Sequence, residues 1–350
     1  MIYCNRCVIP DTRPNTIFKD GVCQACTNYD KRKEIDWGSR LDELRDLLNE
    51  HRGMDKYDCV IPVSGGKDSH YLVYTLKNIF RMNPLLIKVD DGFTMTEEGR
   101  YNLSNLSSVF NCDLMEFSVN KTTLKEMARA AFAELGNFPY VDYFIYSIPL
   151  RLASQLGIKL VVFGENPSYE YGTTDEDSPL ININELMGSQ GHFWTSRNFD
   201  EMLRPLDSMK IDKDIKAVYM SYYMPWSGHQ NYILAQKCGF KELSWNRQGH
   251  IENYDSIDSL GWLVSNHLKY LKFGFGRATD IACRWIREGL ISREKAVELV
   301  NQADEILDNR ILKDFLQVTG YKYDEFWEIS LRFINQDIFS KGLVKKYPLV

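Results

Sequence analysis

Residues 57–69 read Tyr-Asp-Cys-Val-Ile-Pro-Val-Ser-Gly-Gly-Lys-Asp-Ser and are the most informative part of the sequence. An apolar run leads into a glycine-rich turn, and an amphipathic stretch follows the turn. Such a combination is typical of a phosphate cradle, because glycines let the backbone approach an anion and take positive φ, and a helix N-terminus favours negative charge. Lys67 adds a cation. The alternative is a turn that only caps a helix.

Asp68 predicts a metal ion at the same turn. A carboxylate beside phosphate oxygens repels them, so its position is best explained by a divalent cation, Mg²⁺, between the two. Two better-known phosphate loops are excluded by spacing. A Walker loop needs Gly, four residues and then Gly-Lys-Ser/Thr, and a dinucleotide fingerprint needs Gly-x-Gly-x-x-Gly; neither is present here.

Further strands are predicted downstream of the turn, at 85–90, 113–118 and 159–163, with helical patterns between them. Strands that alternate with helices predict an α/β fold, in which a parallel sheet is flanked by helices. Ligands of such sheets bind at the carboxyl ends of the strands. Ser64, Asp90 and Gly164 all fall at that edge.

Length, charge and hydropathy narrow the class of protein. A chain of 350 residues exceeds the usual size of one domain. The formal net charge of −6 argues against a large nucleic-acid footprint. No window reaches the ~18 apolar residues of a membrane span, and the N-terminus lacks the apolar stretch of a secretory signal. We therefore expect a cytoplasmic protein with neither nucleic acid nor membrane as a partner.

Four of the eight cysteines lie within the first 26 residues. Cys4-x-x-Cys7, fifteen residues and then Cys23-x-x-Cys26 have the spacing of a structural zinc site with four thiolate ligands. An iron–sulfur cluster or two redox disulfides are the alternatives, and a reducing cytosol disfavours disulfides. Because such a zinc ion has no open position for water, it would fold this segment rather than catalyse.

Two later regions could contact a substrate. Residues 181–254 are irregular and aromatic, and their aromatic side chains are interpreted as core or, alternatively, as a sugar site that includes Tyr223, Trp226 and His229. The last hundred residues are predicted to be helical, with helices at 257–270, 278–288, 293–307 and 323–335. Within them, residues 272–277 form a glycine-hinged loop whose Arg277 is either an anion ligand or an ordinary solvated residue.

The turn resembles the pyrophosphate loop, Ser-Gly-Gly-x-Asp-Ser, of the N-type ATP pyrophosphatases. That superfamily includes GMP synthetase, NAD synthetase, asparagine synthetase and tRNA thiolation enzymes, and it splits ATP between the α and β phosphates. Read with residues 3–14, 89–93, 163–167 and 272–277, the chain resembles the N-acetyl sugar amidotransferases of lipopolysaccharide, O-antigen and flagellar-sugar biosynthesis.

This resemblance implies three parts and an adenine nucleotide alpha hydrolase-like fold. A zinc-binding segment with a lead-in helix is expected at 1–52, a PP-loop ATP pyrophosphatase domain with an aromatic-rich insertion at 53–255, and a helical region at 256–350. The implied reaction uses ATP and ammonia to convert an acetamido group of a nucleotide-linked sugar into an acetamidino group. An O-adenylyl imidate forms, and AMP and pyrophosphate are released.

The resemblance also implies roles for individual residues. Lys67, Asp68 and Glu165 are the catalytic candidates; Asp68 is the magnesium ligand, and Glu165 contacts either metal or substrate. The expected nucleotide contacts are Val63, Ser64, Gly65, Gly66, Lys67, Asp68, Ser69, Val89, Asp90, Gly164 and Glu165. The expected substrate contacts are Asn166, Tyr223, Trp226, His229 and Arg277.

A source of ammonia is missing from the sequence. Residue 2 is Ile rather than a nucleophilic cysteine, and no Gly-x-Cys-x-Gly elbow surrounds any cysteine. By resemblance, a separate glutaminase with a cyclase-like subunit is the expected partner. The alternatives are a PP-loop tRNA-modifying thiolase or ligase, which the acidic charge and the lack of a further cysteine pair disfavour, and a non-catalytic nucleotide-binding adaptor.

Overall fold

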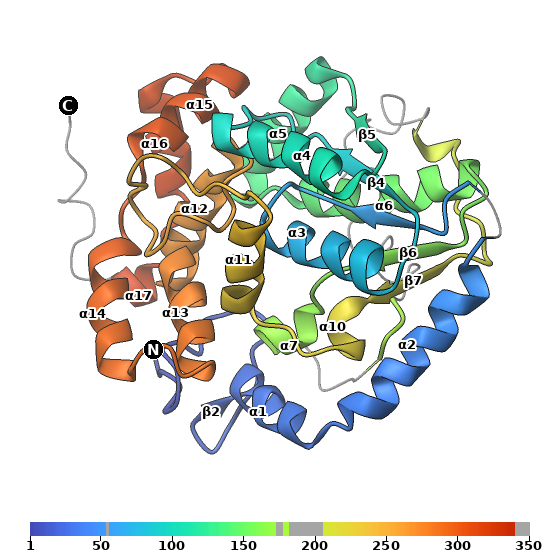
Figure 1. The fold of residues 1–350 in the computed structure, drawn as a ribbon. Helices are drawn as coiled ribbons and strands as arrows, with labels where there is room; N and C mark the ends of the chain where they lie inside the picture. Colours follow the sequence, from blue (N-terminus) through green and yellow to red (C-terminus); the bar gives the residue numbers. More distant parts are fainter. Residues whose placement is uncertain (54–55, 173–177, 182–205, 340–350) are drawn as a thin grey trace.

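A five-stranded parallel sheet lies at the centre of the molecule (Figure 1). The computed structural model describes residues 1–53, 56–172, 178–181 and 206–339. In spatial order the strands are β5 (Leu114–Phe117), β4 (Pro84–Val89), β3 (Cys59–Pro62), β6 (Leu160–Phe163) and β7 (Lys216–Tyr219). The chain runs outward from β3 to β5 and then returns to the other side of β3. The strand order therefore reverses beside β3, where such sheets bind ligands.

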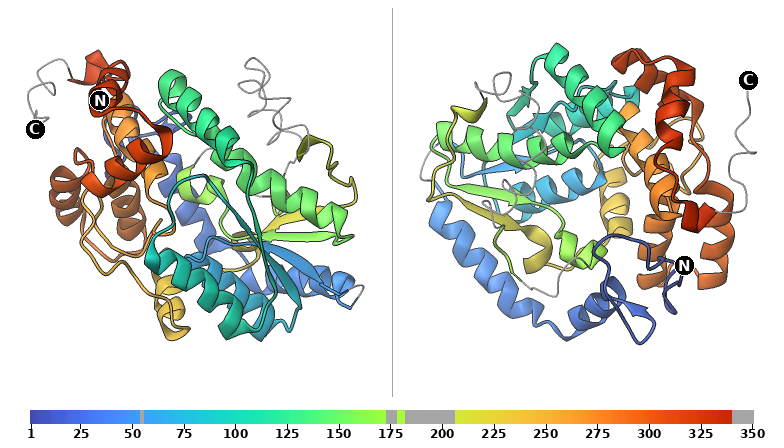
Figure 2. Two further views of the ribbon diagram at one scale, coloured as in Figure 1. Left: turned by 90° about the horizontal axis from the view of Figure 1, so that it is seen from above. Right: turned by 180° about the vertical axis from the view of Figure 1, so that it is seen from behind.

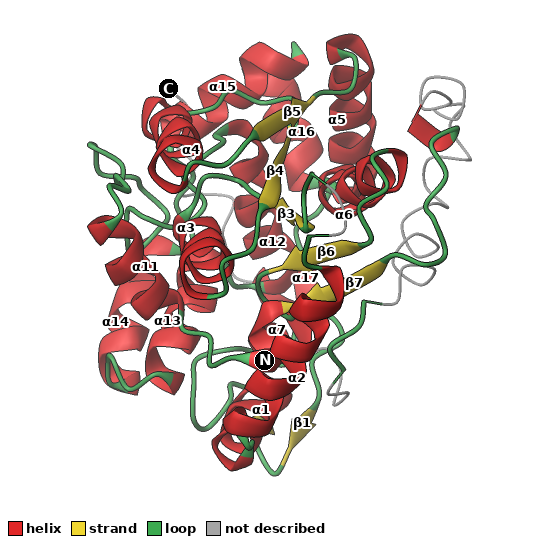
Figure 3. Cartoon of the chain, turned by 45° about the vertical axis from the view of Figure 1, so that its right-hand side comes forward, coloured by secondary structure: helices red, strands yellow, loops and turns green. Residues whose placement is uncertain are grey.

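Helices cover both faces of the sheet, which confirms the predicted α/β class (Figure 3). The helices α2 (Trp37–His51), α3 (Lys67–Tyr74) and α4 (Glu97–Phe110) cover one face, and α5 (Lys121–Leu135) and α6 (Pro139–Gln155) cover the other. Alternate strand residues enter the two cores, so that Ile61 packs with the first set of helices and Val60 with the second. Burial on both faces explains the nearly continuous apolar run of β3.

The C-terminal region is helical, as predicted, and stands along one side of the sheet domain (Figure 2). Its elements are η3 (Gly261–Leu263), α12 (Val264–Phe273), α13 (Arg277–Arg287), α14 (Arg293–Ala303), α15 (Asn309–Thr319), α16 (Tyr323–Leu331) and α17 (Gln336–Phe339). Glycines in the left-handed conformation end α12 and α15, at Gly274 and Gly320. Phe132 of α5 stacks on Phe326 and meets Phe315 edge-on, with ring centroids 5.2 and 4.9 Å apart.

The N-terminal segment packs against this helical region and not against the sheet alone. It contains a small hairpin, β1 (Phe18–Lys19) and β2 (Val22–Cys23), followed by α1 (Gln24–Lys31) and η1 (Arg32–Glu34). The four N-terminal cysteines share a buried cluster with Ala282, Cys283 and Ala296 of α13 and α14. The chain start accordingly lies beside α13 and α14 in Figure 1.

The stretch 181–254 is more regular than the sequence predicts. Besides β7 it contains α10 (Met220–Tyr223) and α11 (Gly228–Lys237), and residues 182–205 lie outside the described part of the chain. The strand was missed because Lys216–Tyr219 has no long apolar pattern, and its pairing with β6 defines it. The prediction of an irregular segment was therefore wrong for these elements.

Two helix assignments in the C-terminal region also differ. The α-helix predicted at 257–270 begins only at Val264, because Ser259 forms an isolated bridge with Met95 and a 3-10 turn, η3, lies between the two. α15 was not predicted, although Ile311, Leu312 and Phe315 lie on its buried face. Between α3 and β4 the chain continues as a π-helical turn, η2 (Thr75–Ile79).

None of the helices in the described part of the chain combines the length and apolarity that a membrane crossing requires.

The aromatic contact between α5 and α15 gives a test of the fold. Phe315→Ala removes a fully buried ring that touches five others, so we expect a loss of about 3–5 kcal/mol in the free energy of unfolding. Urea unfolding followed by circular dichroism measures this loss. Lys313→Ala, an exposed position of the same helix, serves as the control. A loss below about 1 kcal/mol for Phe315→Ala would contradict this packing.

Candidate functional site

The glycine-rich turn lies between the end of β3 and the start of α3. Gly65 has φ of +88°, and a Cβ there would lie 2.9 Å from the backbone nitrogen of Leu103. Both the conformation and the space therefore require glycine. Gly66 has an ordinary φ of −71° and is the N-cap of α3, so the expectation of positive φ holds for only one of the two glycines.

Hydrogen bonds within the turn fix its shape before any ligand arrives. The backbone N–H of Gly66 donates to Ser64 Oγ at 3.2 Å, and that of Ser64 donates to Ser69 Oγ at 3.1 Å. No side chain caps the N-terminus of α3. Its first N–H groups consequently remain available to an anion, as a phosphate cradle requires.

Lys67 sits at the centre of a buried ion network. Its Nζ lies 2.6 Å from Asp68 Oδ2 and 3.0 Å from Asp255 Oδ1. Asp255 also pairs with Arg277 and lies 3.9 Å from Arg284. Burial alone would raise the pKa of Asp255, but Arg277, Lys67 and Arg284 outweigh it and hold that pKa well below its usual range.

The turn and this network line one cavity of about 360 Å³ at the carboxyl edge of the sheet. Its wall combines the phosphate turn with apolar side chains such as Ile87, Val89, Phe144 and Phe163. A cavity of this size with a few convergent polar groups suits a small polar ligand. The predicted site residues that line it are Val63, Ser64, Gly66, Lys67, Asp68, Ser69, Val89, Asp90, Glu165 and Arg277.

Two carboxyl groups line the cavity beside the phosphate turn. Burial, helped by the charge of Glu170, raises the pKa of Glu165 to about 8. Asp142 lines the same cavity from α6, where its side chain is exposed. Near neutral pH Glu165 can therefore hold and release a proton.

Several predicted contacts lie away from the cavity wall. Trp226 is buried edge-on against Tyr71, and a Cβ on Gly164 would lie 2.9 Å from its ring. Gly164 therefore serves this close packing, and Trp226 and Tyr223 belong to the core beneath the site. Core packing, which the sequence left as an alternative, accounts for both aromatic residues.

Asn166 and His229 are likewise absent from the lining of the described cavities. Asn166 is buried, and its backbone N–H donates to Ser221 Oγ at 2.8 Å. His229 lies half-buried in the first turn of α11. The structure does not bring either residue to the cavity.

Three residues of the site were missed from the sequence: Asp142, Asn231 and Asp255. Asn231 of α11 donates to Asp68 Oδ1 at 2.7 Å, and Asp255 binds Lys67. Both lie in or next to the stretch that was predicted to be irregular, and no pattern in the sequence marks either residue. Asp142 could have been found as a lone acid in the apolar stretch that forms α6.

The four N-terminal cysteines form a group that can hold a metal ion. Their sulfur atoms all lie within 4.8 Å of one another, and all four side chains are buried. Thiolates around a tetrahedral zinc ion are about 3.8 Å apart, and Cys7 Sγ lies 3.7 Å from Cys23 Sγ. Backbone N–H groups of Arg6 and Cys23 donate to Cys4 Sγ, which suits a thiolate ligand.

The C-terminal region is similar to a known protein family. Residues 248–347 match the family described as the C-terminal domain of WbpG-like LPS biosynthesis proteins. Residues 248–347 are similar to this domain, and we call them the WbpG-like domain. The match confirms the resemblance to a family of lipopolysaccharide biosynthesis, and Asp255, Arg277 and Arg284 of the ion network all belong to the WbpG-like domain.

Other similarities are more distant. An uncharacterized protein of Methanocaldococcus jannaschii, MJ1599, is 27% identical over 304 residues, which cover 84% of this chain and 91% of that protein. The U34-tRNA thiolase NcsA of Methanococcus maripaludis, solved with its [4Fe-4S] cluster, aligns with 85% of this chain and 88% of its own at 14% identity and a TM-score of 0.37. The NH3-dependent NAD synthetase of Campylobacter jejuni aligns with 61% of this chain and 100% of its own at 15% identity and a TM-score of 0.30.

The raised pKa of Glu165 predicts a pH-dependent stability. Between its ordinary pKa of 4.5 and about 8, the folded protein holds a proton that the unfolded chain has lost, so stability falls as the pH rises. Glu165→Gln should abolish this contribution, whose slope reaches at most about 1.4 kcal/mol per pH unit.

Urea unfolding of the nucleotide-free protein at pH 5, 6, 7 and 8 measures it. The stability difference between Glu165→Gln and wild type should grow with pH, whereas Glu126→Gln, at an exposed position, should give a constant difference. Parallel curves for Glu165→Gln and wild type would contradict the raised pKa.

Proposed function

We propose that this protein is an ATP-dependent amidotransferase of surface polysaccharide biosynthesis. It would convert an acetamido group of a nucleotide-linked sugar into an acetamidino group. The observation that carries the proposal is the junction in one cavity of a phosphate turn with Arg277 of a WbpG-like domain. The turn suits ATP, and the domain links the chain to lipopolysaccharide biosynthesis.

The chemistry requires ATP because an amide carbonyl is a poor electrophile and its oxygen is a poor leaving group. In the first step the amide oxygen attacks the α-phosphorus, the bond from that phosphorus to the β-phosphate bridging oxygen breaks, and pyrophosphate leaves. In the second step ammonia attacks the imidate carbon, the carbon–oxygen bond breaks, and AMP leaves. One proton is released as the neutral amine becomes part of the amidine.

The residues of the cavity support each step by position and charge. The free N–H groups at the start of α3 and the Lys67 ammonium would neutralise the phosphates as pyrophosphate leaves. Arg277 faces the same space from the opposite domain. The carboxylate of Asp142, which lines the same cavity, would accept the proton that ammonia releases, and Glu165, whose pKa of about 8 keeps it protonated near neutral pH, would contact the substrate.

Asp68 fits the role of magnesium ligand. Its carboxylate lines the cavity, and Asn231 and Lys67 orient it. Mg²⁺ bound to nucleotides commonly uses one or two protein carboxylates together with phosphate oxygens, so one aspartate is enough. When bound, the ion would shield the phosphates and stabilise the departing pyrophosphate.

The N-terminal cysteines would hold a structural zinc ion. The close spacing of their sulfurs suits one tetrahedral ion. All four ligands come from the chain, so the ion would stabilise the segment that contacts the WbpG-like domain and would leave catalysis to the cavity.

A separate glutaminase with a cyclase-like subunit would supply ammonia. The resemblance implies this partner, and the sequence lacks the nucleophile motifs of a glutaminase. The chain would act in the cytoplasm, where ATP and sugar nucleotides are made.

Asp68→Asn tests the magnesium assignment. Loss of the carboxylate should lower AMP release with ammonium and a diacetamido sugar nucleotide by at least about 10²-fold, while the fold and the metal content of the cysteine site stay unchanged. AMP is measured by chromatography and metal by atomic emission. Asp46→Asn on the exposed face of α2 is the matched control. Near-normal turnover of Asp68→Asn, or ADP as the product, would overturn this assignment.

The source of nitrogen gives a second test. The purified protein should form AMP with ammonium salts and should not use glutamine, because no glutaminase is part of the sequence. Glutamine and ammonium are compared at equal concentration in the same assay, with ammonium-free buffer as the blank. Robust glutamine-dependent turnover by this chain alone would refute the requirement for a partner.

A further inference from the structure

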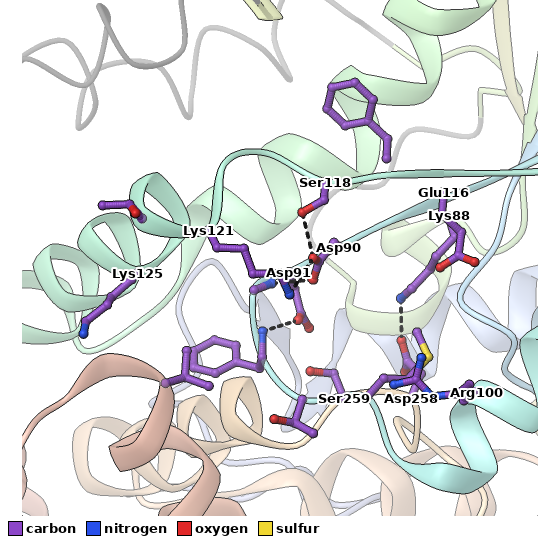
Figure 4. A pocket seen from close by; sticks show the side chains of 17 residues that line it. Lys88, Asp90, Asp91, Arg100, Glu116, Ser118, Lys121, Lys125, Asp258 and Ser259 are labelled. Atoms are coloured by element: carbon purple, nitrogen blue, oxygen red, sulfur yellow. Dashed lines mark hydrogen bonds and ion pairs between the residues drawn. The ribbon is translucent and has the colours of Figure 1, made fainter.

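A second cavity, of about 670 Å³, borders the first (Figure 4). Lys88, Asp90, Asp91 and Asp258 line both cavities and thus form a shared wall. The second cavity extends from this wall over the ends of β4 and β5 to the first turns of α5. No residue of the phosphate turn, 63–69, belongs to its lining. The triphosphate of ATP would therefore occupy the first cavity and leave the second one free for another ligand.

The charges of the shared wall are largely satisfied within the protein. Lys88 Nζ lies 3.0 Å from Asp258 Oδ2, and this pair is the dashed contact on the right of Figure 4. Asp90 accepts hydrogen bonds from the Ser118 hydroxyl and the Gly92 N–H, both at 2.8 Å. Asp91 accepts the Phe93 N–H at 2.9 Å, and burial raises its pKa. These acids repel an incoming anion less than their number suggests.

Cations dominate the outer part of the cavity. Lys121 and Lys125 are one turn apart and project from the same face of α5, with Arg100 of α4 on the other side (Figure 4). Lys125 and Arg100 form no ion pair with any described residue, and Lys121 is 80% exposed at 3.6 Å from Asp90. Glu116 is the acid that faces them without a partner among the described residues.

The start of α5 does not itself supply anion-binding N–H groups. Asn120 Oδ1 already accepts the N–H groups of Thr122 and Thr123. Recognition of an anion would therefore come from the side-chain ammonium and guanidinium groups, which bind phosphate oxygens well. Apolar side chains of Phe93, Met95, Phe117 and Val318 line the same cavity and offer a surface for a base.

We propose that the second cavity binds the nucleoside diphosphate half of the acceptor, so that its sugar reaches the first cavity across the shared wall. This inference rests on the proposed function, which requires a nucleotide-linked sugar. The size of the cavity suits a nucleoside diphosphate, its free cations suit the diphosphate, and its position beside the ATP cavity lets the acetamido group approach the α-phosphorus. Lys121, Lys125 and Arg100 are the phosphate ligands.

The test measures binding and turnover separately. Calorimetry with UDP and GDP as probes, and with ATP, is carried out on wild type, on the double variant Lys121→Ala/Lys125→Ala and on Lys313→Ala, an exposed lysine outside both cavities. The double variant should bind the preferred diphosphate at least about 10-fold more weakly, equivalent to ~1.4 kcal/mol. Its ATP affinity should stay within about twofold of wild type. Lys125→Arg alone should retain binding, and Arg100→Ala should weaken it.

Turnover then separates this inference from the proposed function. In AMP release with ammonium, the double variant should raise the KM for the sugar nucleotide and leave the KM for ATP unchanged. Unchanged diphosphate binding in the double variant, or no binding of either diphosphate to wild type, would overturn the inference even if the enzyme releases AMP. An equal loss of ATP affinity would assign the cavity to ATP and also overturn it. Lysine-dependent diphosphate binding without AMP release from any sugar nucleotide would support the cavity assignment and remove the amidotransferase.

Discussion

The carboxylate of Asp255 is the point on which the two halves of the site depend. It binds Lys67 of the phosphate turn and Arg277 of the WbpG-like domain, and Arg284 lies nearby. Lys67 also pairs with Asp68 and Arg284 with Glu170, so that acids and cations alternate across the contact between the two halves. Removal of such an acid would leave buried cations without a partner, a change that is costly in proteins. The same contact therefore closes the cavity and sets its charge.

The WbpG-like domain and the phosphate turn meet at this contact, although they lie far apart in the sequence. The turn belongs to the sheet, whose strand order brings ligands to the end of β3. The helical region supplies the opposite wall. A sheet of this type can serve many reactions, so the residues contributed by the helical region, and the cations of α4 and α5, are where selectivity for an acceptor would arise.

The sequence predicts the parts of the molecule that depend on local pattern. The turn at Ser64–Ser69, four of the five central strands and the cysteine group follow from spacing and from short-range rules. The contributions of Asn231 and Asp255 could not be predicted, because a single polar residue carries no periodic signal and its role arises from tertiary packing. Trp226 illustrates the converse. The aromatic composition of residues 181–254 suggested that it contacts a ligand, but its ring packs closely against Gly164 in the core.

The contact between the first and last parts of the chain also affects the order in which the protein can fold. Arg293 donates to the carbonyl oxygens of Cys7 and Cys4, across 286 and 289 residues, and Arg13 pairs with Asp280 at 2.9 Å. Contacts of such sequence separation form slowly, since the loop between them must close first. During synthesis on the ribosome, the cysteine segment emerges long before α13 and α14, so it finds its packing partners only after these helices have been translated. A segment that is made early thus reaches its native surroundings late.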